Sequence, residues 1–376
     1  MKANTYRCML LAGFIISMIM APLSAEGLLS MDYSLFNTVT INTESETCWG
    51  YTVGGLAKPA YKSTGNRNVK SEVSLNIAFP AIPVSETSAL LRISLDKAYI
   101  KVRFPGFRFT SGKTRVSWGD GFVFNSGDIV FGSTGTSIDL TASEIRDQTY
   151  WLTSVNIPFG RFSFIEALVL PPPLSNIFLL ESTIGTRIYT TLNMIKMESG
   201  YIYKGSETTH SAYLGFQGNF GADWYAASSL SLPAVWDSDA LAEGAEESWN
   251  ISCGLFYLYR IDRIRSMTLR FEGLIRPFGS WEEVDSDASS TYGILLYPEI
   301  TYAPSDTIHL LTRSIISPID LSAKITAGVS WNIFQSFSLI GYVTGNVGDS
   351  TDIFSWNSNM PETSSLAVMI GCTYIY

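Results

Sequence analysis

Charged residues, cysteines and histidines are scarce in this sequence, and no long apolar segment follows its first 25 residues. Only 16% of the 376 residues are charged, against roughly 25% in an average soluble domain. Beyond the N-terminal region, no stretch approaches the ~20 consecutive apolar residues that a membrane-spanning helix needs. The sequence therefore fits neither a bundle of transmembrane helices nor an ordinary soluble domain.

The few cysteines and histidines also argue against catalytic and metal sites. Cys48, Cys253 and Cys372 lie far apart and form no Cys-x-x-Cys pair, which indicates neither a zinc site nor a disulfide framework, and the sequence leaves open whether two of them pair. His210 and His309 are the only histidines, and no Gly-x-Ser-x-Gly, His-Glu-x-x-His or phosphate-binding loop occurs. We therefore predict that the protein is not an enzyme and uses no cofactor and no metal.

The charge balance is acidic. Setting aside Lys2 and Arg7 in the N-terminal region leaves 23 Lys and Arg against 34 Asp and Glu, a net charge of −11. This charge argues against a nucleic-acid partner, because nucleic acids attract basic surfaces. Many of the acids gather in residues 237–248 and 282–290, which combine charge with small residues and are predicted to be exposed loops. Their spacing matches no calcium-binding loop.

The first 25 residues have the features of a secretory signal peptide. Lys2 and Arg7 precede an apolar run from Cys8 to Leu23, and Leu23-Ser24-Ala25 provides a small-residue cleavage site. The alternative, an uncleaved anchor helix, is disfavoured because the run is short for a spanning helix. We therefore predict a cleaved signal peptide over residues 1–25 and a mature domain over residues 26–376.

Residues 95–104 alternate between two very different faces. One face carries Ala98, Ile100, Val102 and Phe104, and the other carries Lys97, Tyr99, Lys101 and Arg103. Successive side chains of a strand point to opposite sides. An apolar face backed by three cations is typical of a strand with lipid on one side and a wet lumen on the other.

The same alternation recurs along the chain, in residues 31–43, 69–79, 150–158, 162–170, 267–276, 291–302, 322–333 and 366–376. The last of these ends on aromatic residues, Tyr374 and Tyr376. In this it resembles bacterial outer-membrane β-barrels, whose closing strand typically ends in an aromatic residue read by the assembly machinery. The resemblance implies insertion into the bacterial outer membrane, with its lipid and the barrel assembly machinery as partners.

We therefore expect an all-β protein, a transmembrane antiparallel β-barrel of about 16 strands, with 14 as the nearest alternative. No helix of three turns is predicted. Residues 57–68, which contain Pro59, Gly65 and several polar residues, are predicted to be a loop.

A glycine-rich segment follows the second strand of the 95–115 region. Arg115-Val116-Ser117-Trp118-Gly119-Asp120-Gly121 leads to Asn125 and Asp128, while Phe131-Gly132 follows. Residues 90–175 resemble porin-like outer-membrane proteins, including alginate-export-like and related large barrels, in which a Trp-Gly-x-Gly turn leads into a constriction segment. We expect residues 117–135 to fold inward, with a β-bulge at Gly112 that returns Val116 to lipid and Arg115 to the lumen. The alternative is a mobile surface loop.

These residues predict a lumen with opposed charges. A cationic ladder of Lys97, Lys101, Arg103, Arg108 and Arg115, together with Tyr99, faces a constriction formed by Trp118, Asp120, Asn125 and Asp128, and Arg270, Glu272 and Arg276 extend it. Opposed charges across a narrow lumen orient polar or anionic solutes. The alternative is that these charges only solvate the lumen wall or neutralise one another. We expect a passive or selective channel for small polar or anionic solutes. The alternatives are a plugged structural or adhesive barrel and, last, an outer-membrane hydrolase; the oligomeric state is left open.

Overall fold

The computed structural model describes residues 27–42, 48–63, 67–79, 92–132, 135, 138–142, 145–146, 148–172, 181–235, 237–283, 292–349, 352–354 and 366–376. Within these ranges the chain forms 18 strands and one helix. The predicted signal peptide, residues 1–25, lies outside them, as does most of the predicted loop 282–290. The strands are β1 Gly27–Asn42, β2 Cys48–Ser63, β3 Val69–Phe79, β4 Arg92–Arg103, β5 Arg108–Thr114, β6 Tyr150–Pro158, β7 Phe164–Leu170, β8 Thr183–Leu192, β9 Ile195–Lys204, β10 Thr209–Asn219, β11 Asp223–Pro233, β12 Asn250–Arg260, β13 Ser266–Ile275, β14 Ile294–Ala303, β15 Ile308–Ser317, β16 Ser322–Phe334, β17 Phe337–Val347 and β18 Leu366–Ile375, and the helix is α2 Ser238–Ser248.

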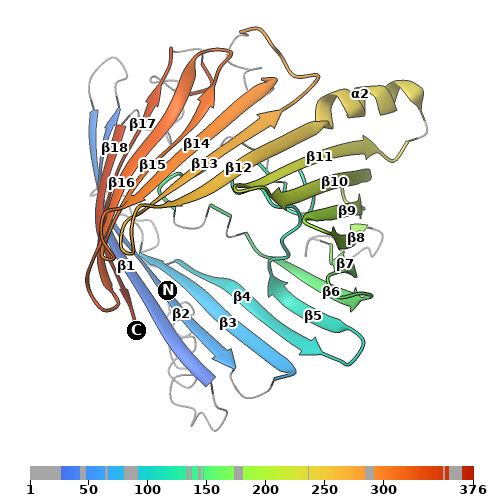
Figure 1. The fold of residues 1–376 in the computed structure, drawn as a ribbon, viewed down its shortest axis with the longest axis horizontal. Helices are drawn as coiled ribbons and strands as arrows, with labels where there is room; N and C mark the ends of the chain where they lie inside the picture. Colours follow the sequence, from blue (N-terminus) through green and yellow to red (C-terminus); the bar gives the residue numbers. More distant parts are fainter. Residues whose placement is uncertain are drawn as a thin grey trace, which may run out of the picture.

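The strands form one closed antiparallel barrel (Figure 1). Each strand pairs with the strand before it and the strand after it, and β18 pairs back with β1. In this closing seam the terminal residue takes part directly, since Met31 N–H donates to the Tyr376 carbonyl at 2.9 Å and Tyr376 N–H donates to the Met31 carbonyl at 3.0 Å. Closure leaves no unpaired sheet edge, which is the condition for a sheet to survive in lipid.

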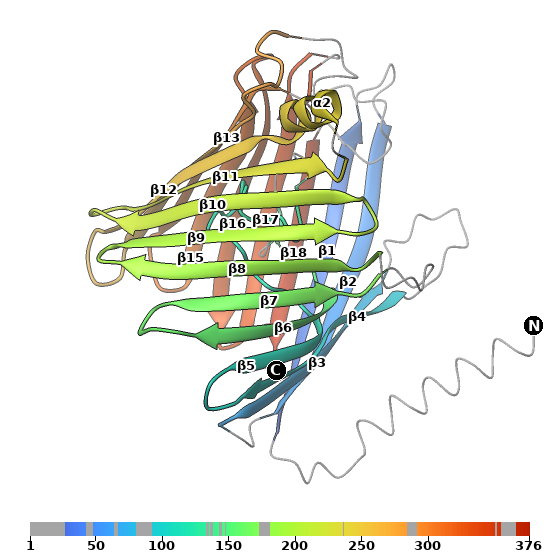
Figure 2. The same ribbon diagram turned by 90° about the vertical axis from the view of Figure 1, so that its right-hand side faces the viewer.

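The connections differ in length between the two ends of the barrel (Figure 2). At the end where β1 begins and β18 ends, every connection has at most five residues, for example 104–107, 159–163 and 193–194. At the other end the connections reach 35 residues, in segment 115–149 between β5 and β6. Short turns at one end and long loops at the other are typical of outer-membrane barrels.

Side chains alternate around the wall as the sequence predicts. Large apolar side chains of the outer face are exposed, among them Ile100, Ile188, Leu214 and Ile300 at 52%, 49%, 45% and 49%. Their strand neighbours point inward, where many are buried, such as Tyr213, which is 3% exposed, and Glu299, which is 8% exposed. An apolar exterior and a polar interior are the reverse of a soluble domain.

The barrel has 18 strands, so the predicted count of 16 is too low, although the fold class is confirmed. One cause is that some hairpins turn without glycine or proline. The turn between β8 and β9 uses Asn193 with φ 55°, and the turn between β16 and β17 uses Ser336 with φ 69°. Without glycine or proline at the turn, the sequence does not mark where one strand ends and the next begins.

Two further expectations are wrong. Residues 57–63, predicted to be part of a loop, continue β2. The pairing of β2 with β3 is interrupted at Pro59, between the pairs Ala57↔Ile77 and Ala60↔Ser74. Proline has no N–H to donate there. Residues 238–248 of the predicted acidic loop form α2, a helix of 11 residues with no buried residue. No helix in the described part of the chain is long and apolar enough to cross a membrane.

Candidate functional site: the inward segment and the lumen wall

After β5 the chain leaves the wall and enters the barrel interior (Figure 1). We define the inward segment as the described residues between 115 and 146, and its residues 123–130 are all buried. They contact side chains from strands far along the sequence, so the segment is a packed structure and the mobile-loop alternative does not apply. This confirms the predicted inward fold near residues 117–135.

The segment turns sharply at Gly119. Its backbone has φ +70°, and a Cβ there would lie 2.2 Å from Asn125 Oδ1 and 2.8 Å from Gly127 Cα. Asn125 fixes the turn from both sides, because its Nδ2 donates to the Trp118 carbonyl at 2.9 Å and its Oδ1 accepts from Gly127 N–H at 3.0 Å. The Trp-Gly-x-Gly sequence therefore codes for a loop that only glycine permits.

Glu272 of β13 binds the middle of the segment. One carboxylate oxygen accepts from Phe122 N–H at 2.8 Å, and the other accepts from Val123 N–H at 2.7 Å and Phe124 N–H at 2.9 Å. Two strands away, on β11, the Tyr225 hydroxyl donates to the Phe124 carbonyl at 2.9 Å. The three hydrogen bonds from these consecutive N–H groups are charge-assisted, because the acceptor is a carboxylate, and each is stronger than a neutral hydrogen bond.

A second anchor surrounds Arg187 of β8. Its guanidinium bridges Glu166 of β7 at 2.7 Å and Glu198 of β9 at 2.8 Å, and it also donates to the Ser117 carbonyl at 2.8 Å. The same two carboxylates accept from the segment: Glu166 from Trp118 Nε1 at 3.1 Å, and Glu198 from Gly119 N–H at 3.2 Å. Each of the three charges therefore has a partner, as buried charges require.

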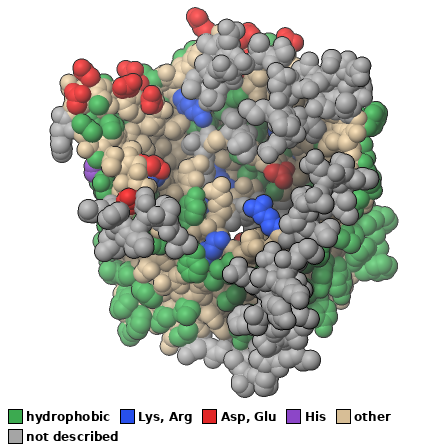
Figure 3. Space-filling model, turned by 180° about the vertical axis from the view of Figure 1, so that it is seen from behind, with side chains coloured by type: hydrophobic (Ala, Val, Ile, Leu, Met, Phe, Trp, Pro, Cys, Tyr) green, Lys and Arg blue, Asp and Glu red, His purple; other side chains and the backbone are tan. Residues whose placement is uncertain are grey.

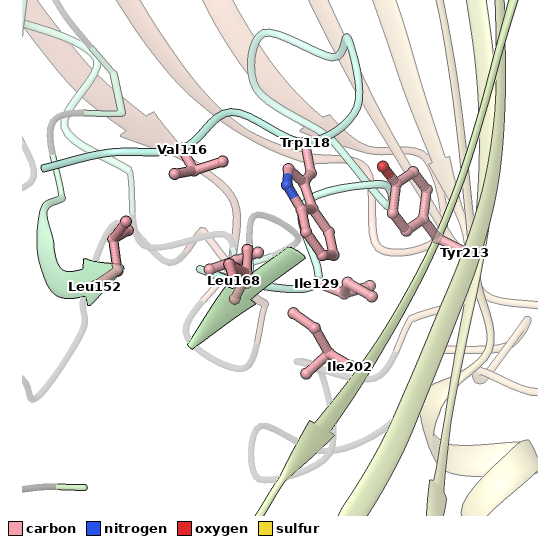
Figure 4. Packing of buried hydrophobic residues seen from close by; sticks show 8 residues of the cluster. Val116, Trp118, Ile129, Leu152, Leu168, Ile202 and Tyr213 are labelled. Atoms are coloured by element: carbon pink, nitrogen blue, oxygen red, sulfur yellow. The ribbon is translucent and has the colours of Figure 1, made fainter. Parts of the chain in front are cut away.

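Two apolar clusters complete the packing. In the first, Trp118 is fully buried against Ile202 and Tyr213 of the wall (Figure 4). In the second, Val123, Phe124 and Leu140 pack on inward side chains of β13, β14 and β15, namely Leu274, Leu295, Tyr297 and Ile315. The segment is therefore held on two separate sectors of the barrel.

The C-terminal part of the segment is held through its carbonyl groups. Arg313 of β15 donates to the Ala142 carbonyl at 2.8 Å, and Lys324 of β16 donates to the Ile138 carbonyl at 3.0 Å. Two cations from the wall thus replace the water that these carbonyls would otherwise bind.

The wall from β2 to β5 has a different character. Its inward positions carry Lys58, Lys62, Lys70, Arg92, Lys97, Lys101, Arg103 and Arg108, and register puts Lys70 directly opposite Lys101 and Arg103 directly opposite Arg108. Like charges that face each other across two strands destabilise the sheet. Within the described residues, one of these cations forms an ion pair: Lys62 lies 3.9 Å from Glu72. We call these eight inward cations of β2–β5 the cationic wall.

The structure separates the predicted site residues into three groups. Lys97, Tyr99, Lys101, Arg103 and Arg108 lie on the cationic wall, where Tyr99 hydroxyl donates to Glu72 at 2.7 Å and the Lys101 ammonium lies 4.7 Å from the Tyr99 ring centroid. Half the ring away, Arg270 and Glu272 lie on β13, beside Asp120. Arg276 lies beyond the end of β13, 3.4 Å from Asn250 Oδ1.

Two details of the prediction are wrong. Pairing of β5 with β4 and β6 continues without a shift through Gly112, so the predicted bulge is absent and Lys113 keeps the outer parity of Phe109. Arg115 instead reaches the interior because the chain leaves the wall after Thr114, and Val116 joins the inner cluster, not lipid. Arg115 and Asp128 form an ion pair within the segment, at 2.8 Å, so this one cation of the predicted ladder faces a predicted carboxylate, while the other four cations lie on the barrel wall.

The sequence reading missed the anchoring residues of the wall: Glu166, Arg187, Glu198, Tyr213, Tyr225, Ser252, Glu299, Arg313 and Lys324. A signal for them exists. Glu166 and Arg187 are the single charges of β7 and β8, and Glu198 is the single acid of β9, which also carries Lys196 and Lys204; all three face inward. A charge at an inward position without a neighbour of its own sign marks a partner within the barrel.

Beside the segment lies a pocket of about 190 Å³, lined among others by Asp120, Asp223, Phe256 and Arg270. The Arg270 guanidinium lies 3.8 Å from the Phe122 ring centroid and 3.6 Å from Glu299. The pKa of Asp120 is raised, first because this carboxyl is confined within the barrel and second because the Glu198 carboxylate lies nearby. The face opposite to that in Figure 1 is hollowed near its middle, where basic and acidic side chains are visible (Figure 3).

Comparison with known proteins gives similarity of fold. No protein-family model matches the chain, and no curated protein matches it in sequence. Among solved structures it is similar to OccAB3 of Acinetobacter baumannii, with a TM-score of 0.55, 10% identity and coverage of 93% of this chain and 99% of that one. It is also similar to a BenF-like porin from Pseudomonas fluorescens Pf-5 (0.58, 8%, 94% and 98%). A third is Wzi of Escherichia coli, an outer membrane protein of capsule assembly and a carbohydrate-binding β-barrel (0.58, 12%, 95% and 86%). These likenesses place the chain among porin-like barrel folds.

Proposed function

We propose that this protein is a channel of the bacterial outer membrane through which small polar or anionic solutes pass. In this proposal the chain is exported with a cleaved signal peptide, is inserted by the barrel assembly machinery, and has no enzymatic activity. The porin-like neighbours support the fold that such a channel needs, and the unequal ends of the barrel support its orientation, with the long loops outside the cell. The finer likeness to alginate-export-like barrels stays a prediction.

One observation carries the anionic preference: the cationic wall. Lys70 opposite Lys101 and Arg103 opposite Arg108 weaken the pairing of β3, β4 and β5. An anionic solute that passes between them relieves the repulsion. The inward carboxylates on the rest of the ring, Glu166 and Glu198 on β7 and β9 and Glu272 and Glu299 on β13 and β14, are bound by Arg187, Arg270 or the N–H groups of the inward segment. Because the inward segment packs against the neutralised carboxylates, the open part of the lumen lies next to the cations of β2–β5, which attract anions.

The proposal predicts the behaviour of the triple variant Lys97→Gln, Lys101→Gln and Arg103→Gln. These side chains lie on the inner face, so the variant should fold and insert like the parent. Its ion selectivity should shift towards cations, because three positive charges leave the lumen wall. The measurement is the reversal potential in planar bilayers under a salt gradient. The control is Lys204→Gln on β9, a strand outside the cationic wall. Unchanged selectivity in a folded, conducting triple variant would contradict the proposal.

A second candidate is a plugged structural or adhesive barrel. The two apolar clusters favour it, because a segment packed on two sectors fills much of the lumen. The same bilayer recording separates the two functions. A folded protein that gives no conductance steps, in the parent and in the triple variant alike, is a plugged barrel.

A further inference from the structure

One edge of β4 has no strand beside it in the half of the wall nearer the long loops. Pairing of β4 with β5 ends at Ala98↔Lys113, and β5 itself ends at Thr114, where the chain turns into the barrel (Figure 1). β6 begins opposite Thr114, at Tyr150, and rises no further. The edge of Arg92–Lys97 that faces β5 therefore has no strand partner in the described part of the chain, and we call this place the gap. In lipid such an edge is costly, because its N–H and C=O groups find no water.

A single lysine lies on the outer face next to the gap. Among the strand residues that the structure describes, Lys113 is the one Lys, Arg, Asp or Glu at an outward position, with the parity of Phe109. Its ammonium donates to the Leu95 carbonyl at the edge of the gap, and Thr149 Oγ1 donates to the neighbouring Asp96 carbonyl at 2.7 Å. An ammonium has three N–H donors, so two remain after the bond to Leu95. A charge among lipid-facing side chains is expensive and marks a functional site with a charged partner.

Cations also line the gap on the side of the lumen. Lys97 and Arg92 face inward and belong to the cationic wall. One carboxylate lies at the same edge, that of Asp96, which accepts from Ser74 Oγ at 3.2 Å. With Lys113 outside, the gap is flanked by three positive charges and one negative charge. This excess of positive charge suits an anion.

The part of the wall beside the gap is weakly held on its other side as well. The pairing of β2 with β3 is interrupted at Pro59. Next to the interruption, Asn76 Oδ1 is buried and has no hydrogen-bond partner among the described residues. The outer face of these strands is apolar, with Phe79 46% and Ile93 38% exposed. This half of β3 and β4 can therefore shift to admit a polar group into the gap while its outer face packs on acyl chains.

We propose that the gap binds the head group of an anionic lipid that carries a phosphate group. The phosphate lies between Lys113 on the lipid side and Lys97 and Arg92 on the side of the lumen, and the acyl chains lie along the outer face of β3 and β4. Its oxygens accept charge-assisted hydrogen bonds from these cations, and the hydrated head group supplies the partners that the free edge of β4 lacks. The inference rests on the proposed location in a membrane and is independent of which solute passes through the lumen.

The test measures which lipid lies next to the gap. A fluorophore is attached at Ile93→Cys in a variant in which Cys48, Cys253 and Cys372 are serine, with Val329→Cys on the outer face of β16 as the control position. The protein is reconstituted in phosphatidylcholine vesicles that contain a small fraction of nitroxide-labelled phosphatidylglycerol or nitroxide-labelled phosphatidylcholine. At position 93 we expect phosphatidylglycerol to associate about fivefold more tightly, the factor for one lysine at a membrane surface. At position 329 both lipids should quench equally.

Variants of Lys113 decide the outcome. Lys113→Gln should remove the preference for phosphatidylglycerol at position 93, Lys113→Arg should keep it, and the control Lys204→Gln on β9 should leave it unchanged. Equal quenching by both lipids at position 93 in the parent, or a preference that persists in Lys113→Gln, overturns the inference. A preference that dissolved glycerol phosphate abolishes indicates a solute site open to water and also overturns it. If neither lipid quenches position 329, the membrane-barrel proposal itself fails.

Discussion

Among single residues, Glu272 has the largest share in holding the inward segment. It is 2% exposed and binds three consecutive N–H groups with two oxygens. Hydrogen bonds to a charged group contribute about 1.5–3 kcal/mol each, so this carboxylate offsets part of the entropic cost of ordering the segment. No other side chain in the described residues contacts the segment backbone as often.

Replacing Glu272 by Gln should loosen the segment without unfolding the barrel. The amide has one acceptor oxygen in place of two, so at least one of the three N–H groups loses its partner. We expect larger and noisier single-channel conductance, with the heat-dependent mobility of the folded barrel in detergent gels unchanged. Glu243→Gln on the exposed helix α2 is the matched control. Conductance identical to the parent would show that the segment does not limit permeation.

Asp120 supplies a pH dependence. Because confinement and the Glu198 carboxylate raise its pKa, this carboxyl takes up a proton at a higher pH than an ordinary Asp. As pH falls and Asp120 takes up its proton, the lumen loses a negative charge, so anion selectivity should rise. Asp120→Asn should show the higher anion selectivity already at neutral pH and should lose the early step of the profile. Reversal potentials recorded between about pH 7 and pH 4 test this, and an unchanged profile in the variant rules Asp120 out as the titrating group.

At the scale of elements, the strands with strict alternation were predictable and the hairpins with plain turns were not. Residues 69–79, 150–158 and 366–375 are strands, as their period indicates. The turn between β8 and β9 could not be predicted in this way, because its left-handed residue is Asn193, and a single asparagine without glycine or proline does not mark a turn clearly. The helix α2 was not predicted because Leu241 is its only large apolar side chain, and the face that packs on β11 consists otherwise of alanine, glycine and serine.

The candidate site was half predictable for a similar reason. Trp118, Asn125 and the glycines were found because a loop of unusual geometry needs particular residue types. Their partners on β7, β8 and β9 follow only from the ring order of the strands, which no local pattern contains. Arg187, Glu166 and Glu198 meet because three successive strands bring their inward positions side by side.

The closing strand gives a prediction at this scale. Tyr376 exchanges two backbone hydrogen bonds with Met31, and its side chain is 79% exposed. Deleting Tyr376 removes both bonds at the seam, and replacing it by Asp also puts a charge at the rim. Both variants should assemble more slowly into vesicles, in the order deletion or Asp, then Phe, then parent, as followed by gel mobility. A Tyr376→Asp variant that inserts at the parental rate contradicts the role of this residue in closure.

For the molecule as a whole, the inward segment decides how wide the passage is. An 18-strand ring encloses more space than wall side chains fill, and two apolar clusters and several ionic anchors bring residues 115–146 into that space. Replacing residues 119–131 with a Gly-Ser linker of equal length should therefore raise single-channel conductance several-fold and reduce anion selectivity. The variant should also melt at a lower temperature, because Leu274, Leu295 and Ile315 lose their cover. Parental conductance would mean that another part of the chain closes the lumen.

The anchors of the inward segment are distributed unevenly round the ring. In the part of the chain that the structure describes, they come from strands between β6 and β16 and from Ile353 and Phe354 between β17 and β18, and none comes from β1 or β18, the two strands that pair at the closing seam. The β1–β18 seam, which closes last during assembly, is therefore formed by strands that do not hold the inward segment in place. Mutation can alter how the protein is assembled and what it admits as independent traits, each with its own set of residues.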